Sequence, residues 1–291
     1  MKCFKIKCIN SLKPLIYAVV YFLYYTKFAT QKPLIYFFCY CIYFFNKTKR
    51  IRAIRNLQVA FNIETKSAQK LYKQSLCIMI NNFMAMAFIM AGLLKQKEID
   101  SLTIQSPTYL DKLVNSNKGA IAISGHIGNF PLMVVALANK GYPVSLIFKE
   151  SKYFGGSLFK KTLSFYNITA IPYADNSNDM LQLINRSIKK GEILFFLIDQ
   201  KGKNSINVRF FDRNIPVFYG PVIFARRTGA SIIPIFTHFN GSKHIIDVYK
   251  TLDIKVDNVN TAQNIQLMIS IIENYIKEHP DNWNWTYYKW D

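Results

Sequence analysis

From residue 101 onward, short apolar runs of strand type alternate with segments that have helical spacing. The candidate strands are Ala120–Ile123, Val144–Phe148, Ala170–Pro172, Ile193–Ile198, Ser231–Thr237 and Ile245–Val248. The candidate helices fall near residues 130–139, 156–166, 177–189, 219–228 and 261–277. Strands that alternate with helices build an α/β fold in which most strands are parallel. We therefore expect one mixed, mostly parallel sheet flanked by helices.

The chain before residue 101 is predicted to be helical. Residues 48–97 have helical spacing, with a second helix from about Ser67 to Leu94 that is apolar nearly all round between Cys77 and Met90. Such a helix is usually buried or lies on a membrane. The predicted organisation is a membrane-anchoring segment (1–46), a helical, membrane-proximal region (47–100) and an α/β domain (101–291), with no linker that would separate a second folded domain.

The N-terminal segment is both apolar and basic. Pro14–Phe45 is an apolar stretch interrupted by Lys27, Gln31, Lys32 and Pro33, and each half is shorter than the roughly 20 residues that span a bilayer. Three arrangements are open: two helices in the interface, a re-entrant hairpin, or one imperfect spanning helix. The basic residues that follow favour the cytoplasmic side of the membrane.

Charge and cysteine content narrow the class of protein. The net charge is +20, hydrophobic residues make up 51% of the chain, and residues 1–55 contain Lys and Arg but no Asp or Glu. Nucleic-acid-binding arms are basic but not apolar, so the composition favours an anionic membrane and anionic substrates over nucleic acid. All five cysteines lie in the first 77 residues without zinc-ligand spacing, which fits a reducing compartment and leaves the α/β region without a thiol.

His126 is the first candidate for chemistry. The segment Ser124-Gly125-His126-Ile127-Gly128 ends a candidate strand and precedes a candidate helix. An imidazole at such a junction is held by rigid flanking elements and titrates near neutral pH, which suits a general base. The alternative is a polar residue that fills a loop. The chain has no Gly-x-Gly-x-x-Gly, Walker, Gly-x-Ser-x-Gly or His-Glu-x-x-His motif, which argues against nucleotide-dependent enzymes, serine hydrolases and zinc proteases.

The segment around His126 resembles the His-x4-acid motif of the late acyltransferases of lipid A biosynthesis, the lauroyl/myristoyl acyltransferases. These belong to a bacterial lysophospholipid acyltransferase-like superfamily. Further segments follow in that family's order: Arg52–Phe61, Phe195–Gln200, Val208–Phe211, Tyr219–Pro221, Thr228–Ala230, Pro234 and Ile272–Trp285. The resemblance covers residues 50–291 and implies a glycerolipid acyltransferase-like fold.

The resemblance also implies a function. The chain would be a membrane-bound O-acyltransferase at the cytoplasmic face of the bacterial inner membrane. It would transfer a fatty acyl chain from acyl carrier protein, an acidic partner that suits a basic surface, to a hydroxyl of a glycolipid such as a lipid A precursor. No metal or other cofactor is implied. Two alternatives are an acyltransferase for a lysophospholipid or aminolipid, and a non-catalytic lipid-binding relative.

One departure from the family motif affects the mechanism. The family's acid follows the His by five residues, and Pro131 stands there in this chain. In the family's usual mechanism the His deprotonates the acceptor hydroxyl and the carboxylate stabilises the imidazolium. Three hypotheses remain: a distant carboxylate substitutes, with Asp199 ahead of Glu150; the His works alone; or the chain no longer catalyses. A carboxylate within hydrogen-bond reach of His126 would favour an enzyme.

The other candidate site residues are polar or cationic. Lys149 follows a candidate strand, where relatives tend to carry Arg, and could hold an anionic group or an oxyanion. Arg209 and Arg226 are candidates for phosphate binding. Asn129 and Gln200, which lie in the two motif segments, are further candidates for substrate binding, although Asn129 and Pro131 also suit a helix N-cap and a first helical turn. The alternative interpretation is that these cations are ordinary surface residues and that the polar residues cap loops.

All three tryptophans (Trp283, Trp285 and Trp290) lie in the last nine residues. Clustered aromatic residues of this kind suit a membrane interface. They could equally pack the C-terminus onto the core.

Overall fold

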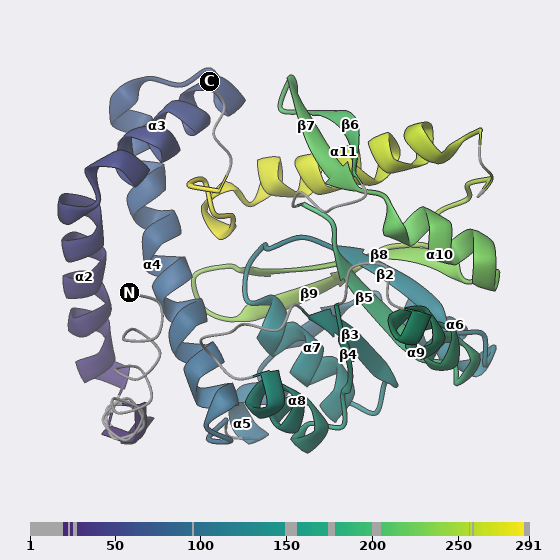
Figure 1. Ribbon diagram of the computed structural model, residues 1–291. Coiled ribbons are helices and arrows are strands. Elements are labelled where there is room, and N and C mark those ends of the chain that lie inside the picture. Colours follow the sequence, from purple (N-terminus) through teal and green to yellow (C-terminus); the bar gives the residue numbers. More distant parts are fainter. Residues whose placement is uncertain are drawn as a thin grey trace, which may run out of the picture.

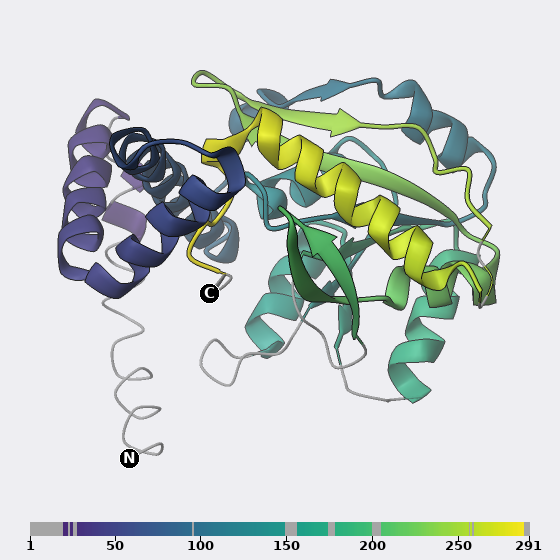
Figure 2. The same ribbon diagram turned by 90° about the horizontal axis from the view of Figure 1, so that it is seen from above.

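The computed structural model describes residues 20–22, 24–25, 28–94, 96–148, 156–173, 178–199, 205–255, 257 and 259–287. The first three helices with defined bounds in the described part of the chain are α2 (Phe28–Phe45), α3 (Lys47–Phe61) and α4 (Thr65–Met90). Figures 1 and 2 show them grouped at one side of the molecule, with α4 between α2 and the sheet.

Among the described residues, seven strands form one sheet in the order β1-β9-β8-β2-β5-β3-β4. Their bounds are β1 (Thr103–Gln105), β2 (Ala120–Ser124), β3 (Val144–Phe148), β4 (Thr169–Pro172), β5 (Ile193–Leu197), β8 (Ser231–Phe239) and β9 (His244–Val248). Every neighbouring pair is parallel except β8 and β9, which form an antiparallel pair. The predicted mixed, mostly parallel sheet is therefore confirmed.

The other described helices follow α4 along the chain. They are α5 (Gln96–Asp100), α6 (Thr108–Asn115), α7 (Phe130–Asn139), α8 (Gly156–Phe165), α9 (Asn178–Lys189), α10 (Gly220–Thr228), α11 (Thr261–Glu278) and the short 3₁₀ helix η1 (Pro280–Asn282). All five helices and six strands predicted from residue 101 onward are present, with ends that differ by at most two residues. The elements α5, α6 and β1 are short and were not predicted.

A separate antiparallel hairpin, β6 (Ser205–Phe210) and β7 (Arg213–Phe218), was also not predicted. Its strands alternate polar and apolar residues because only one of their faces is buried. Pro216 lies within β7, and a proline inside a run argues against a central strand. A two-stranded hairpin tolerates it because each of its strands has an unpaired edge.

Side-chain alternation explains why both faces of the sheet are covered. In β2, Ile121 and Ile123 belong to the buried cluster that includes α9, α10, α11 and the hairpin β6–β7. Ala120 and Ala122 point to the other face, into the cluster that includes α6, α7 and α8. In Figure 1, α11 lies above the sheet and α7 and α8 lie below it. Parallel strands need such double coverage because both of their faces are apolar.

The helices before residue 101 share this core. Residues of α2, α3 and α4 such as Cys39, Leu57 and Leu76 belong to the same buried cluster as Ile121. The Sγ atoms of Cys39 in α2 and Cys77 in α4 lie 2.9 Å apart as a thiol–thiol hydrogen bond. The first helices are therefore packed against the sheet rather than set apart from it.

The polar residues and proline at positions 31–33, which interrupt the N-terminal apolar stretch, do not break a helix. Helix α2 runs through these residues from Phe28 to Phe45. Pro33 lies in its second turn, where the missing N–H removes a single backbone hydrogen bond near the helix start. Among the residues that the structure describes, no helix combines the length and the apolar character needed to cross a membrane. Residues 1–19 lie outside the described residues.

The C-terminal segment packs onto the core. Trp283 and Trp285 are fully buried, so the membrane-interface interpretation is wrong for these two residues. The Nδ2 of Asn56 in α3 donates to the carbonyl oxygen of Trp285 at 2.8 Å, and the hydroxyl of Ser75 in α4 donates to that of Trp283 at 2.7 Å. Trp290 lies outside the described residues.

We expect Asn56→Ala to destabilise the fold. The substitution removes the buried donor to the Trp285 carbonyl, and an unpaired buried polar group costs about 1–3 kcal/mol. Urea denaturation should show a free energy of unfolding lower by this amount. The control is Gln58→Ala, which removes a solvent-facing hydrogen bond from the same helix to Thr65. Equal stability of the two variants would contradict the role given to Asn56.

Candidate active site

His126 lies in the loop between β2, which ends at Ser124, and α7, which begins at Phe130. The side chain of Asn129 caps this helix by accepting a hydrogen bond from the N–H of Leu132 at 3.2 Å, and Pro131 occupies the first turn. Both features were predicted and are confirmed. They show that proline is structurally compatible with the position where the family motif has its acid.

Asp199 lies two residues after the end of β5, the parallel neighbour of β2. Ser124 and Leu197 are partners in the register, so the two strands end at the same edge of the sheet. The Oδ1 of Asp199 lies 2.7 Å from Nδ1 of His126, and its Oδ2 accepts a hydrogen bond from the backbone N–H of His126 at 2.8 Å. The predicted contact between a distant carboxylate and His126 is thus present in the structure.

The two side chains of this pair differ in solvent exposure. The side chain of Asp199 is 2% exposed, whereas that of His126 is 34% exposed. The indole Nε1 of Trp283 donates a third hydrogen bond to Asp199, to Oδ2 at 3.1 Å. The carboxylate is therefore buried and held in place, while the imidazole reaches the surface.

The electrostatics of the pair follow from these contacts. Burial alone would raise the pKa of the Asp199 carboxyl. The charge of His126 and the hydrogen bonds from its ring, from Trp283 and from the His126 N–H outweigh burial, so this pKa lies below its usual range. Burial likewise lowers the pKa of the His126 imidazole, but the Asp199 carboxylate outweighs it and holds that pKa above its ordinary value.

The loop that carries His126 is held from three sides. The N–H of Gly128 donates to the carbonyl oxygen of Asn282 at 2.7 Å, and its carbonyl oxygen accepts from Nδ2 of Asn82 at 2.8 Å. Gly128 has a positive φ of 54°, and a Cβ there would lie 2.2 Å from the carbonyl oxygen of Thr237. Glycine is required because any side chain would collide with that backbone.

Three residues that support the site were not predicted to do so: Trp283, Asn82 and Asn282. Asn82 is a polar residue within the apolar stretch of α4, which was a usable signal. Trp283 lay in one of the family segments, but no sequence pattern indicated that its indole would bind Asp199. The bridge that Ile127 forms with Trp283 brings the two segments together.

The structure describes three of the other candidate residues: Asn129, Arg209 and Arg226. Lys149, Glu150 and Gln200 lie outside the described residues. Arg209, on β6, is exposed and pairs with Asp212 at 3.0 Å, and Arg226 is partly exposed on α10. Asn129 is buried beneath the loop as a helix cap. Their substrate-binding roles stay predictions.

The geometry suits proton transfer. Because Asp199 engages Nδ1, proton acceptance at His126 falls to Nε2. A buried carboxylate on the far nitrogen fixes the tautomer and stabilises the imidazolium that forms, as in a Ser-His-Asp triad. Such a pair can deprotonate a hydroxyl that attacks an acyl group.

Comparison with known proteins agrees with this chemistry. Residues 10–291 match the family described as bacterial lipid A biosynthesis acyltransferase. The chain belongs to this family. It is also similar to the phosphatidylinositol mannoside acyltransferase of Mycobacterium tuberculosis, with 20% identity over 186 residues. That match covers 62% of this chain and 58% of the relative, so the chain spans less than two thirds of the relative's length. The resemblance predicted from the motifs is confirmed.

Asp199→Asn should change both the rate and the pH dependence of acyl transfer. With His126 as the base, the neutral imidazole is the active form, so the rate should rise with pH through the imidazole pKa. Loss of the carboxylate lowers that pKa and shifts the acid limb of the pH–rate profile to lower pH. The maximal rate should still fall by about 10²–10⁴, because the imidazolium loses its partner.

The control for this experiment is Asp111→Asn, which removes an exposed carboxylate on α6 that accepts a hydrogen bond from the hydroxyl of Tyr142. It should leave the rate and the profile unchanged. The losses in Asp199→Asn and His126→Ala should not add in the double variant, because the two groups act as a unit. An acid limb that does not move in Asp199→Asn would contradict the assignment.

Proposed function

We propose that this protein transfers a fatty acyl chain from acyl carrier protein to a hydroxyl of a glycolipid, with a lipid A precursor as acceptor. The observation that carries the proposal is the buried Asp199 carboxylate on Nδ1 of the partly exposed His126, in a chain of this family. A non-catalytic lipid-binding relative has no need for such a pair. The pair therefore favours the enzymatic hypothesis.

The proposed reaction proceeds in two steps. Nε2 of His126 accepts the proton of the acceptor hydroxyl while the oxygen attacks the thioester carbonyl and forms a tetrahedral intermediate. The carbon–sulfur bond then breaks, the ester remains on the acceptor, and the imidazolium returns its proton to the leaving thiolate. Asp199 stabilises the imidazolium between the two steps. Lys149 is proposed to stabilise the oxyanion or to bind phosphate.

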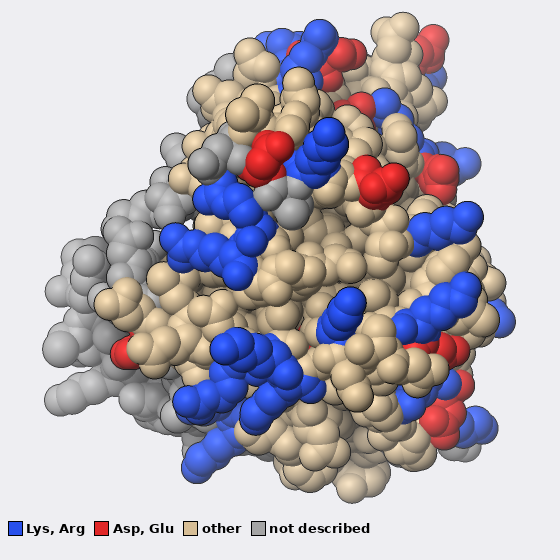
Figure 3. Space-filling view, turned by 90° about the vertical axis from the view of Figure 1, so that its right-hand side faces the viewer, with Lys and Arg blue, Asp and Glu red and all other residues tan. Residues whose placement is uncertain are grey.

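The structure offers a basic surface for an acidic donor protein. Helix α9 ends with Arg186 and Lys189, and α10 ends with Arg226 and Arg227. Lys and Arg side chains predominate over Asp and Glu on the face shown in Figure 3. Such a surface favours encounter with an acidic carrier protein.

A second acceptor class is favoured by the comparison with the mycobacterial relative. That protein is named for phosphatidylinositol mannoside, a glycosylated phospholipid. We therefore keep a glycosylated phospholipid as the alternative acceptor. Both acceptor classes present a sugar hydroxyl to the proposed base.

We propose that the protein lies at the cytoplasmic face of the bacterial inner membrane, with α2 in the interface. This helix leaves several aromatic side chains exposed: Tyr36, Phe37, Phe38, Tyr40, Phe44 and Phe45. Phe45 is followed at once by the basic residues of α3, including Lys47, Lys49 and Arg50. Aromatic residues beside cations suit the boundary between acyl chains and anionic headgroups.

The function is tested with His126→Ala and His244→Ala as a matched histidine control. Purified proteins receive acyl-acyl carrier protein and either a lipid A precursor or a mannosylated phosphatidylinositol, and the products are identified by lipid mass spectrometry. We expect His126→Ala to lose about 10²–10⁴ in rate while the control stays active. Full activity of His126→Ala with both acceptors would overturn the proposal, and acylation of only the second acceptor would select the alternative.

Membrane placement is tested with a Phe37→Ser, Tyr40→Ser and Phe44→Ser triple variant. Burial of one such side chain contributes about 1.5–3 kcal/mol, so binding to vesicles with anionic lipid should weaken at least about tenfold. Phe165→Ser removes an exposed aromatic residue from α8 and serves as the control. Vesicle sedimentation with equal binding of both variants would show that α2 does not contact the membrane.

A further inference from the structure

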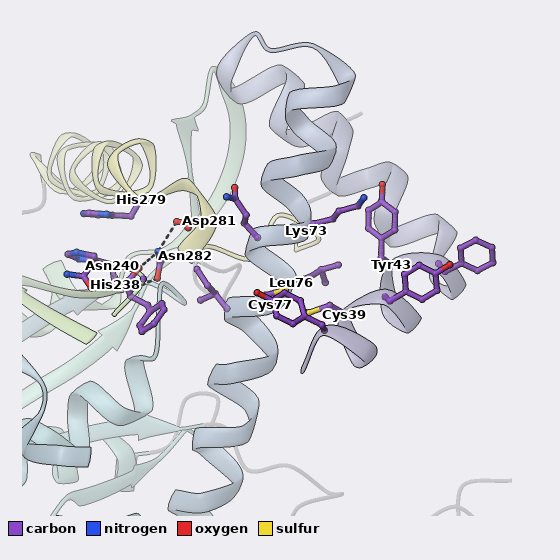
Figure 4. Close-up of a pocket in the computed structure, with 17 residues that line it drawn as sticks. Cys39, Tyr43, Lys73, Leu76, Cys77, His238, Asn240, His279, Asp281 and Asn282 are labelled. Carbon is purple, nitrogen blue, oxygen red and sulfur yellow. Dashed lines mark hydrogen bonds between the residues drawn. The ribbon is translucent and has the colours of Figure 1, made fainter. Parts of the chain in front are cut away.

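Two cysteine side chains meet between α2 and α4. The Sγ atoms of Cys39 in α2 and Cys77 in α4 lie 2.9 Å apart, although the two residues are 38 positions apart in sequence. The sulfur atoms of a disulfide are about 2.05 Å apart, so these thiols need to approach by less than about 1 Å to form one. Figure 4 shows the two sulfur atoms next to each other, with each side chain reaching from its own helix toward the other.

We propose that Cys39 and Cys77 form a redox modification site, at which glutathione disulfide converts the two thiols into a disulfide that joins α2 to α4. The cysteine positions fit a reducing compartment, where the disulfides that do form are usually transient and respond to the redox state. Neither cysteine belongs to the segments that carry His126 and Asp199. The modification is therefore chemically separate from the proposed acyl transfer.

The two thiols differ in their access to solvent. Cys39 is buried, whereas Cys77 is only half-buried. Both line a cavity of about 850 Å³ that lies between α2, α4 and the turn of the β8–β9 hairpin. A small oxidant in this cavity therefore meets the more exposed Cys77 before it meets Cys39.

The contact between the thiols also divides their roles. The hydrogen bond from the Cys39 thiol lowers the pKa of Cys77 and outweighs burial, which raises it. The same hydrogen bond raises the pKa of Cys39, and burial adds to the effect. Because the thiolate is the nucleophile in thiol–disulfide exchange, Cys77 is the attacking group and Cys39 is the resolving group.

The reaction takes two exchange steps. The Cys77 thiolate attacks one sulfur of glutathione disulfide and forms a mixed disulfide, and the first glutathione leaves as a thiolate that takes up the proton lost from Cys77. Cys39 then loses its proton and attacks the Cys77 sulfur. The bond between Cys39 and Cys77 forms, and the second glutathione leaves with that proton. The two cysteines lose two electrons in total, and glutathione disulfide gains them.

The disulfide would fasten α2 to the helix that supports the candidate active site. In α4, Ser75 donates to the carbonyl oxygen of Trp283, and Asn82 donates to that of Gly128. A bond between residues 38 positions apart restricts the unfolded chain more than the folded one, so the oxidised protein should be more stable. The redox state therefore sets how firmly α2 is held, without touching the reacting groups.

The test exposes the full-length protein to an excess of glutathione disulfide, alkylates the remaining thiols and maps all cysteines by peptide mass spectrometry. We expect a peptide pair joined through Cys39 and Cys77, which dithiothreitol converts back to two thiols. In Cys39→Ser the mixed disulfide of Cys77 with glutathione should accumulate, because no resolving thiol remains. The matched control is Cys41→Ser, from the same helix but outside the cavity lining, and it should form the bond as the wild type does.

The wild-type protein alone keeps the test decisive if a variant fails to fold. Its melting temperature should rise on oxidation and return on reduction, because the disulfide constrains the unfolded chain. Oxidation that leaves Cys39 and Cys77 fully alkylated, or that joins them only to other cysteines, would overturn the proposal. A mapped bond with an unchanged melting temperature would overturn the claim that it holds α2 in place.

Discussion

The buried carboxylate of Asp199 joins three parts of the chain that are far apart in sequence. It accepts hydrogen bonds from the ring and the backbone N–H of His126 and from the indole of Trp283. A buried charge is costly unless it is paired and hydrogen-bonded. The carboxylate therefore needs all three donors together. In this way one side chain positions the end of β2, the end of β5 and the C-terminal segment.

This arrangement explains how the chain accommodates Pro131. A carboxylate can support an imidazole base when it reaches Nδ1, and it need not follow the His in sequence to do so. Parallel strands bring their carboxyl ends to one edge of a sheet, where residues from separate strands can meet. The start of α7 is then free to use Asn129 as a cap and Pro131 in its first turn.

The sequence predicted those features that a single continuous segment of residues encodes. The apolar runs predicted the strands, and the position of Asp199 directly after one of them made it the preferred partner of His126. The roles of Trp283 and Asn82 were not predicted because their contacts join residues 84 and 46 positions apart. The hairpin β6–β7 was missed because its half-buried strands and Pro216 lack a continuous apolar run. Whether the tryptophans lie at a membrane interface or pack onto the core depends on tertiary packing, and composition does not encode that packing.

Helix α4 connects the helices before residue 101 to the site. Its Ser75 binds the carbonyl of Trp283, and its Asn82 binds the carbonyl of Gly128, so one rigid helix contacts both segments that hold His126 and Asp199. Helix α2 packs on the same helix through Cys39 and Cys77. If α2 rests in the membrane interface as proposed, the orientation of His126 relative to the bilayer is set by this packing. On the proposed function, a membrane-bound acceptor and a donor from solution would then meet at one fixed imidazole.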